Sequence, residues 1–228
     1  MLTETMEYRT RSTAIAVRIR PWTPPWPLLA FAGVLALAAF GSMAPTTAEV
    51  ELTRAIQGAD PAPLRWSAVT MTAIGLDPWF SLIALASVIA VWWRSRSPSL
   101  ALFLALAVLL RAVSPMVKAI VDRPRPTSDL VDVASTLGSP SYPSGHVLGA
   151  TLLFGFLIYC VERTVPAEGP RRAIQAVLVS LILLMGHARV EMGHHWPTDV
   201  IGGWLIGAIL LAGLVWGHRR WEARHARA

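Results

Sequence analysis

Six apolar segments separated by polar stretches dominate this chain of 228 residues. Hydrophobic residues make up 54% of it, charged residues only 15%, and the mean hydropathy is +0.50, whereas a soluble domain usually carries about 25% charged residues. The pattern indicates an all-α polytopic membrane protein, because a helix satisfies its backbone N–H and C=O groups internally in lipid. We expect a bundle of six transmembrane helices, with spans at about 26–45, 67–93, 99–117, 146–162, 173–187 and 199–217.

Two of the expected spans have unusual features. Asp77-Pro78 interrupts the second segment, which we interpret as one span with a kink, since membrane helices tolerate proline. The first apolar run, 28–44, follows a long polar and basic segment, so a cleaved signal peptide is the alternative to a first span. In the last segment, Gly203 and Gly207 form a GxxxG spacing that lets two helices approach closely.

The basic residues give the expected orientation of the bundle. The chain has 20 basic residues and a formal net charge of +6. Thirteen of them lie in the two tails and in the turns near 94–96 and 162–172, against six in the three opposite loops. The positive-inside rule therefore places both tails in the cytoplasm and the three opposite loops on the extracytoplasmic face. We expect basic cytoplasmic tails at 1–24 and 218–228 around a six-span domain at 25–217.

A strongly basic chain is also typical of nucleic-acid-binding proteins. Here most of the arginines flank apolar segments, as membrane topology requires, so the sequence favours the lipid bilayer over nucleic acid as a partner. Cys160 is the only cysteine, which excludes an intrachain disulfide. The sequence gives no indication of an oligomeric state.

Three polar segments on the expected extracytoplasmic face carry unusual chemistry, and the first of them is basic. Lys118 ends a span, and Arg125 follows seven residues later between Pro124 and Pro126. Lysine and arginine donors in a fixed arrangement clamp phosphate oxygens well. The alternative is an interfacial basic cluster that binds anionic lipid headgroups.

The second polar segment, 143–146, directly precedes an apolar helix. Ser144 is a natural N-cap residue, and Gly145 lets the backbone approach a ligand closely. The free N–H groups at a helix start can hold an anion, and His146 would lie beside it. A capped helix with an interfacial histidine is the alternative interpretation.

The third polar segment, 189–199, is rich in histidine. Asp199 follows His195 by four residues and is therefore placed to accept its ring N–H, which would fix the tautomer and make the other ring nitrogen a better nucleophile. A zinc site is the alternative for such a loop. However, Glu191 does not form the HExxH spacing with His187 or His194, and we expect no metal and no cofactor.

Together the three segments resemble the signature of the type 2 phosphatidic acid phosphatase superfamily, K-x6-R-P, then P-S-G-H, then S-R-x5-H-x3-D. Ala188 is the one departure, because the family usually has serine there. This position would lack one hydroxyl donor to phosphate. The matching residues are Lys118, Arg125 and Pro126 in the first part, Pro143, Ser144, Gly145 and His146 in the second, and Arg189, His195 and Asp199 in the third.

The resemblance implies a metal-independent membrane phosphatase that acts on a lipid monophosphate or diphosphate. It implies that His195 forms a phosphohistidine, that Asp199 orients it and that His146 protonates the leaving oxygen. The phosphate would be held by Lys118, Arg125, Ser144, Gly145 and Arg189. Relatives of this layout act on undecaprenyl pyrophosphate, phosphatidic acid or phosphatidylglycerol phosphate in the plasma (inner) membrane of bacteria. A lipid phosphotransferase with the same intermediate and a non-catalytic lipid-phosphate binding or transport protein are the alternatives.

A few charged residues lie outside this signature. Arg111 lies within a span, where it would extend the phosphate site or pair with an acid such as Asp77. We expect Arg123 and its acidic neighbours, Asp122, Asp129 and Asp132, to form a solvated loop; contact of Arg123 with a second phosphate is the alternative.

Overall fold

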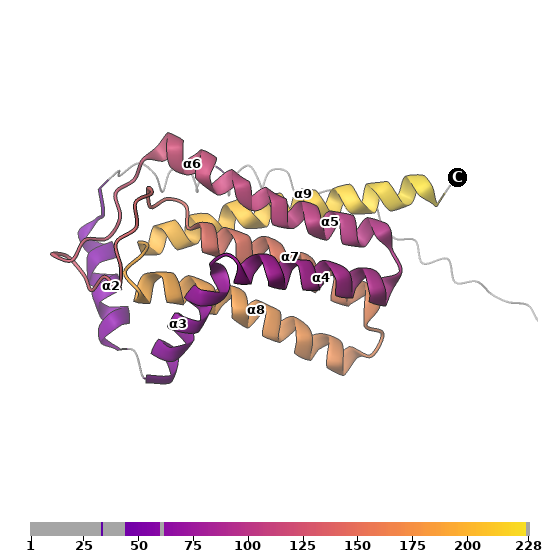
Figure 1. The fold of residues 1–228 in the computed structure, drawn as a ribbon, viewed down its shortest axis with the longest axis horizontal. Helices are drawn as coiled ribbons and strands as arrows, with labels where there is room; N and C mark the ends of the chain where they lie inside the picture. The colour runs from indigo at the N-terminus through magenta and orange to yellow at the C-terminus, as the bar shows by residue number, and fades with distance from the viewer. Residues whose placement is uncertain (1–32, 34–43, 60–61, 227–228) are drawn as a thin grey trace, which may run out of the picture.

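The computed structural model describes residue 33 and residues 44–59 and 62–226, and within these ranges the regular elements are all helices (Figure 1). The N-terminal tail and nearly all of the expected first span, 26–45, lie outside the described residues. The elements are α2 (Thr47–Gly58), α3 (Ala62–Gly75), α4 (Trp79–Ser95), α5 (Pro98–Leu109), the 3-10 turn η1 (Leu110–Ala112), α6 (Val113–Val121), α7 (Gly145–Thr164), α8 (Glu168–Glu191) and α9 (Pro197–His225).

Four of these helical segments are long and apolar enough to cross a membrane: Pro98–Val121, Gly145–Thr164, Glu168–Glu191 and Pro197–His225. The pair Pro63–Gly75 and Trp79–Ser95 passes the same test jointly, which gives up to five spans among the described residues. The chain does break at the expected position, Asp77-Pro78, but it bends there by 74°. Only α4 follows the direction of the bundle, while α3 turns away and packs on α8 (Figure 1).

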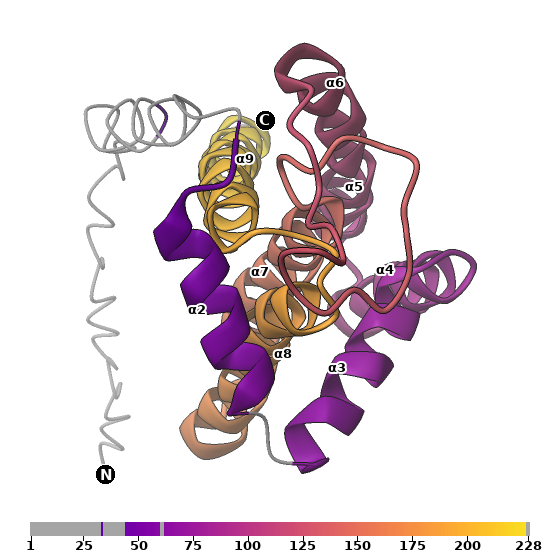
Figure 2. The ribbon, with the colours of Figure 1, turned by 90° about the vertical axis from the view of Figure 1, so that its left-hand side faces the viewer.

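The core of the bundle is α7. It packs against α5, α8 and α9 and is surrounded by them when the molecule is viewed from its end (Figure 2). In its most apolar window 67% of the residues are buried, against 22–33% in the three other long segments. A helix that is apolar on every side has to be covered either by protein or by lipid. The outer helices therefore leave their apolar side chains for lipid, whereas α7 is covered by protein.

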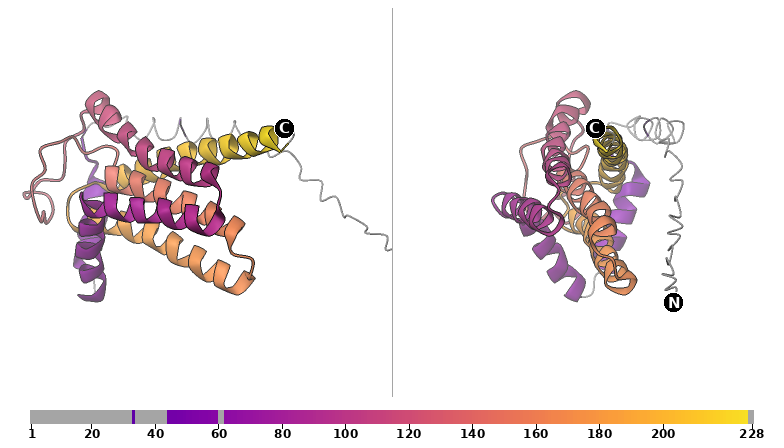
Figure 3. Two further views of the ribbon diagram at one scale, coloured as in Figure 1. Left: turned by 45° about the vertical axis from the view of Figure 1, so that its right-hand side comes forward. Right: turned by 90° about the vertical axis from the view of Figure 1, so that its right-hand side faces the viewer.

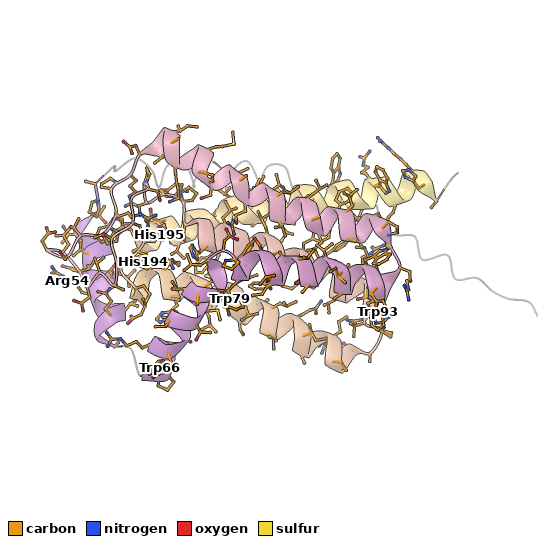
Figure 4. All side chains as sticks on the ribbon, in the orientation of Figure 1. Arg54, Trp66, Trp79, Trp93, His194 and His195 are labelled. Atoms are coloured by element: carbon orange, nitrogen blue, oxygen red, sulfur yellow. The ribbon has the colours of Figure 1, made fainter. Side chains whose placement is uncertain are left out.

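Exposed tryptophans mark the two ends of α4. Trp79 begins this helix and is 59% exposed, and Trp93 lies near its other end and is 66% exposed (Figure 4). Tryptophan is enriched where a membrane helix meets the headgroup region, because its ring is apolar and its N–H is polar. The two tryptophans lie 14 residues apart, about 21 Å of helix, which is less than the roughly 30 Å of a typical hydrocarbon core, so α4 qualifies as a span only together with α3.

All the polar segments singled out above lie at one end of the bundle. The loop between α6 and α7 and the turn between α8 and α9 meet there, and α2 lies across this end beside α8 and α9 (Figures 1 and 2). The turns from α4 to α5 and from α7 to α8 lie at the opposite end, together with the C-terminal part of α9 (Figure 3). Arginines cluster near those two turns and on the C-terminal part of α9. The polar loops and the arginine-rich turns therefore lie at opposite ends of the bundle.

The close contact between α7 and α9 depends on two glycines. A Cβ atom on Gly203 would lie 3.0 Å from the carbonyl oxygen of Ser144 and from Cβ of Val147. A Cβ atom on Gly207 would lie 2.8 Å from Cβ of Thr151. The GxxxG spacing thus brings the start of α9 against the start of α7, as small residues do between membrane helices.

We predict that Gly207→Leu destabilises the protein, because the added side chain has to push α9 away from Thr151. Overpacking of this kind costs about 1–3 kcal/mol. Gly213→Leu is the matched control, since Gly213 lies in the same helix with no atom within 4 Å of its added Cβ. Thermal unfolding in detergent should show a lower midpoint for Gly207→Leu only; equal midpoints for the two variants would contradict the packing argument.

Candidate active site

The three polar segments meet at a cavity of about 420 Å³ at the loop end of the bundle. Six of the eight residues expected at the site line it: Lys118, Arg125, Gly145, His146, Arg189 and His195. Ser144 and Asp199 are fully buried behind this lining. Three neighbours that the sequence motifs did not indicate, Leu137, Gly138 and Ser139, complete the wall. They belong to the long loop before α7, whose path no local pattern predicts.

His195 presents an unprotonated ring nitrogen to this cavity. Arg125 Nη1 lies 3.3 Å from His195 Nε2, and a guanidinium can only donate, so Nε2 accepts and the ring proton lies on Nδ1. Nδ1 is 3.5 Å from Asp199 Oδ2 and 3.5 Å from Ser141 Oγ. Burial, reinforced by the positive charges of Arg125 and Arg189, lowers the pKa of His195 to about 3. The imidazole is therefore neutral at pH 7 and carries a lone pair where a nucleophile needs one.

Asp199 is held rigidly behind His195. It is completely buried, and its Oδ2 accepts the backbone N–H of Trp196 at 2.8 Å and the hydroxyl of Ser141. Its Oδ1 accepts from Arg123 Nη1 at 2.8 Å. These donors keep the carboxylate ionised and directed at the Nδ1 side of His195. Ser141 and Arg123 therefore hold Asp199 in place, although neither is among the catalytic and phosphate-binding residues expected from the sequence.

Arg123 corrects an expectation drawn from the sequence. We expected it in a solvated loop, but its side chain is 2% exposed and lies between two carboxylates. Besides Asp199 it donates from Nη2 to both oxygens of Glu49, at 3.0 and 2.8 Å. Asp122, in the left-handed region at φ 47°, ends α6 and turns the chain so that the next side chain points inward.

Glu49, on α2, is a site residue that the sequence did not reveal. It is 7% exposed, accepts from Arg123 and Thr198, and forms a capping box with Thr46 at the start of α2. Burial raises the pKa of Glu49, but hydrogen bonds from Thr198, Thr46 and Arg123 outweigh this and hold the pKa below its ordinary value. The capping box is the only local sequence feature that marks Glu49, and it indicates the start of a helix, not the contact with Arg123.

The three cations of the cavity are held by neutral acceptors. Lys118 donates to the carbonyl oxygens of Pro140 and Ser141. Arg125 donates to the carbonyl oxygens of Ser139 at 2.6 Å and His194 at 2.5 Å, and burial lowers its pKa. Because none of the cavity-lining residues is acidic, these positive charges are available to an anion.

Arg189, 1% exposed, is the third cation. It donates to Thr72 Oγ1 at 3.1 Å and to His194 Nδ1. His194 Nε2 therefore carries the proton and donates to Ser135 Oγ at 2.9 Å. Burial and these neighbouring arginines lower the pKa of His194 to about 4, so it orients Arg189 as a neutral ring.

Three buried polar groups of the site, two at the start of α7 and one on α8, have no partner. Ser144 takes the expected N-cap position, but its side chain caps no backbone N–H. Its hydroxyl, Nε2 of His146 and Nε of Arg189 are buried and have no hydrogen-bond partner in the structure. Buried polar groups without partners are costly. A bound phosphate would provide acceptors for the donors among them and for the N–H groups of the helix start.

In the described part of the chain, no three His, Cys, Asp or Glu side chains converge as metal ligands would.

Arg111, for which the sequence left two roles open, forms an ion pair with Asp77 at 2.7 Å. Ala188, at the position where serine was expected, is fully buried in the apolar core.

Comparison with known families and proteins supports this description. A family model described as the PAP2 superfamily matches residues 98–223. Over 102 residues the chain is 29% identical to phosphatidylglycerophosphatase B of Bacillus subtilis, and over 68 residues it is 41% identical to an undecaprenyl-diphosphatase of Sulfolobus acidocaldarius. The first alignment covers 44% of this chain and 48% of the relative, and the second covers 30% of this chain and 29% of the relative. The chain therefore matches about half of the first relative's length and less than a third of the second's.

Two crystal structures have a similar fold. A transmembrane PAP2 type phosphatidylglycerolphosphate phosphatase from Bacillus subtilis superposes with a TM-score of 0.71 at 22% identity, over 84% of this chain and 94% of that one. LpxE of Aquifex aeolicus superposes with a TM-score of 0.54 at 24% identity, over 72% of this chain and 92% of that one. At these identities the structures establish the shared membrane-helical fold.

We predict that Glu49→Gln lowers the stability of the protein markedly, because it leaves the buried Arg123 with one carboxylate fewer. Breaking a buried ion pair in this way costs about 3–5 kcal/mol. Glu51→Gln on the exposed side of the same helix is the matched control. Thermal unfolding in detergent should separate the two variants, and equal midpoints would mean that the Glu49–Arg123 pair is not stabilising.

The depressed pKa of His195 predicts a pH dependence of stability. Its pKa is about 3 in the folded state and about 6.5 in the unfolded chain, so between these values only the unfolded chain binds the proton. Stability therefore rises with pH in this window and is lost as the pH falls below about 6.5, by about 2 kcal/mol at pH 5. His195→Gln removes this contribution. Between pH 7.5 and 5 the thermal unfolding midpoint should fall less in the variant than in the wild type. Equal decreases in both proteins would mean that His195 is not the group whose protonation lowers the stability.

Proposed function

Because this chain belongs to the PAP2 superfamily, we propose that it is an integral-membrane phosphatase that hydrolyses lipid phosphate esters through a phosphohistidine. One observation carries the proposal: the neutral Nε2 of His195 faces a cavity lined by three cations and by His146. The relatives named phosphatidylglycerophosphatase B and undecaprenyl-diphosphatase support a lipid substrate with a phosphate or a diphosphate group.

The first step is binding of the phosphate in the cationic cavity. Lys118, Arg125 and Arg189 neutralise its charge, and the N–H groups at the start of α7 add dipoles from a second direction. Arg125 exchanges its contact with His195 Nε2 for a phosphate oxygen, which frees the lone pair. Phosphoryl transfer depends mainly on such positioning and charge stabilisation. Three fixed cations supply this charge, and we propose that no metal is needed.

In the chemical step, His195 Nε2 attacks phosphorus while the bond to the lipid oxygen breaks. The electron pair goes to the leaving oxygen, which receives a proton from His146 Nε2. Asp199 stabilises the positive charge that develops on the ring of His195 and keeps Nδ1 protonated. In the second step His146 takes a proton from water as the water attacks the phosphohistidine, which releases inorganic phosphate and restores both histidines.

The position of the cavity fits a substrate held in the membrane surface. The cavity lies at the end of the bundle opposite the basic turns, so the positive-inside rule supports an extracytoplasmic site in the plasma membrane of a bacterium with cytoplasmic termini. Phosphatidylglycerol phosphate, phosphatidic acid and undecaprenyl pyrophosphate are the substrates to test. A phosphotransferase would share the phosphohistidine, and a binding protein would share the cavity without turnover.

The test is phosphate release by the purified, detergent-solubilised protein in EDTA, with undecaprenyl pyrophosphate, phosphatidylglycerol phosphate and phosphatidic acid. We predict activity of the wild type on at least one of these lipids and a loss of at least about 10³-fold in His195→Ala. His225→Ala, at the exposed end of α9 away from the cavity, is the matched control and should retain wild-type activity.

Each other outcome argues against part of the proposal. Loss of activity in EDTA that a metal restores would exclude the metal-free mechanism. Full activity of His195→Ala would exclude the phosphohistidine. Transfer of labelled phosphate to an added alcohol in preference to water would favour the phosphotransferase. Binding of the lipids without any phosphate release would favour the non-catalytic alternative.

A further inference from the structure

A second cavity, of about 520 Å³, adjoins the catalytic cavity. The two share Gly145 and His146 as lining residues, so His146 lies between them. The second cavity is formed where the chain breaks between α3 and α4 and where η1 interrupts the helix from α5 to α6. Most of its wall is apolar, which makes the polar groups that it contains conspicuous.

The cation of this cavity is Arg111, in the 3-10 turn η1. Its Nη2 donates to Asp77 at 2.7 Å, and its guanidinium lies 4.6 Å from the ring centroid of Phe80. A cation within a membrane segment is costly and usually has a function. The ion pair uses one N–H of the five that a guanidinium carries, so Asp77 and Phe80 fix its plane and leave other donors for a ligand.

A second polar group points to a ligand independently of this cation. Ser114 is 2% exposed, lines the cavity, and its hydroxyl has no hydrogen-bond partner in the structure. This hydroxyl faces Gly145, where an added Cβ would lie 3.0 Å from it. A buried hydroxyl without a partner is unfavourable, and an acceptor on a bound ligand would restore its hydrogen bond.

We propose that this second cavity binds the lipid-proximal phosphate of a diphosphate, with Arg111 and Ser114 as its donors, and makes the protein selective for lipid diphosphates over monophosphates. The inference rests on the proposed function. When the terminal phosphate occupies the catalytic cavity, the bridging oxygen lies beside His146 and the next group has to enter the adjoining cavity. In a diphosphate that group is a second phosphate, which needs the donors found there. In a monophosphate it is an uncharged carbon, which does not.

The step balances without a further reactant. The bond between His195 Nε2 and the terminal phosphorus forms as the bond from that phosphorus to the bridging oxygen breaks. The bridging oxygen keeps the electron pair and leaves as part of the lipid monophosphate, whose charge Arg111 neutralises. Water then attacks the phosphohistidine, so that lipid diphosphate and water give lipid monophosphate and inorganic phosphate. The apolar remainder of the wall, including Phe80 and Leu109, accommodates the start of the lipid chain.

The test compares farnesyl diphosphate with farnesyl monophosphate, which share one chain and differ only in the second phosphate. We expect a higher kcat/KM for the diphosphate in the wild type. Arg111→Gln should lose about tenfold more activity on the diphosphate than on the monophosphate, as for one charge-assisted hydrogen bond. Ser114→Ala should shift the ratio in the same direction. Arg94→Gln, an exposed cation at the far end of α4, should leave the ratio unchanged.

Asp77→Asn separates binding from structure, because it breaks the same ion pair but keeps the cation. We expect this variant to retain or increase the diphosphate preference, since a negative charge is removed beside the second phosphate. If Arg111→Gln and Asp77→Asn instead reduce both activities equally, the pair only holds the helix break in place and the inference is wrong. Equal wild-type activity on both substrates would also overturn it while the proposed function stands. Activity on neither, nor on the lipids tested above, would overturn both.

Discussion

The site depends on one buried cation that lies between two carboxylates. Arg123 joins Glu49 of α2 to Asp199 of α9, and Asp199 in turn faces the proton-bearing nitrogen of His195. Each of these buried charges would be very costly without its partner, so Arg123, Glu49 and Asp199 stabilise the fold only as a set. The position of His195 is therefore set by charge pairing between distant helices as much as by its own loop.

The neighbouring cations follow the opposite rule. Lys118, Arg125 and Arg189 are held by carbonyl oxygens, hydroxyls and an imidazole instead of carboxylates. Neutral acceptors fix the direction of a donor without cancelling its charge. The protein thus separates two tasks in adjacent space: paired charges give rigidity behind His195, and unpaired charges in front of it give affinity for an anion.

The sequence predicted the elements that have a local pattern. Apolar segments indicated the membrane helices, and three short motifs indicated six of the residues that line the cavity. Arg123 was misassigned because its neighbours are polar, and only the tertiary fold shows that they turn it inward. Glu49 was missed because it lies 74 residues from Arg123 along the chain, and the capping box it forms with Thr46 marks only a helix start. The sharp bend between α3 and α4 exceeded the expected kink, since packing on α8 sets the angle and no local signal does.

The contribution of α2 bears on the order in which the protein is made. Glu49 is synthesised 74 residues before Arg123, whereas Asp199 follows Arg123 by 76 residues. Arg123 can complete its pairing only when α9 has begun to enter the membrane, because Thr198 and Asp199 come with that helix. The ion-pair network behind His195 is thereby completed only after the start of α9 has been made. A chain that lacks α9 would keep Lys118, Arg125 and Arg189 but would have no carboxylate facing Nδ1 of His195.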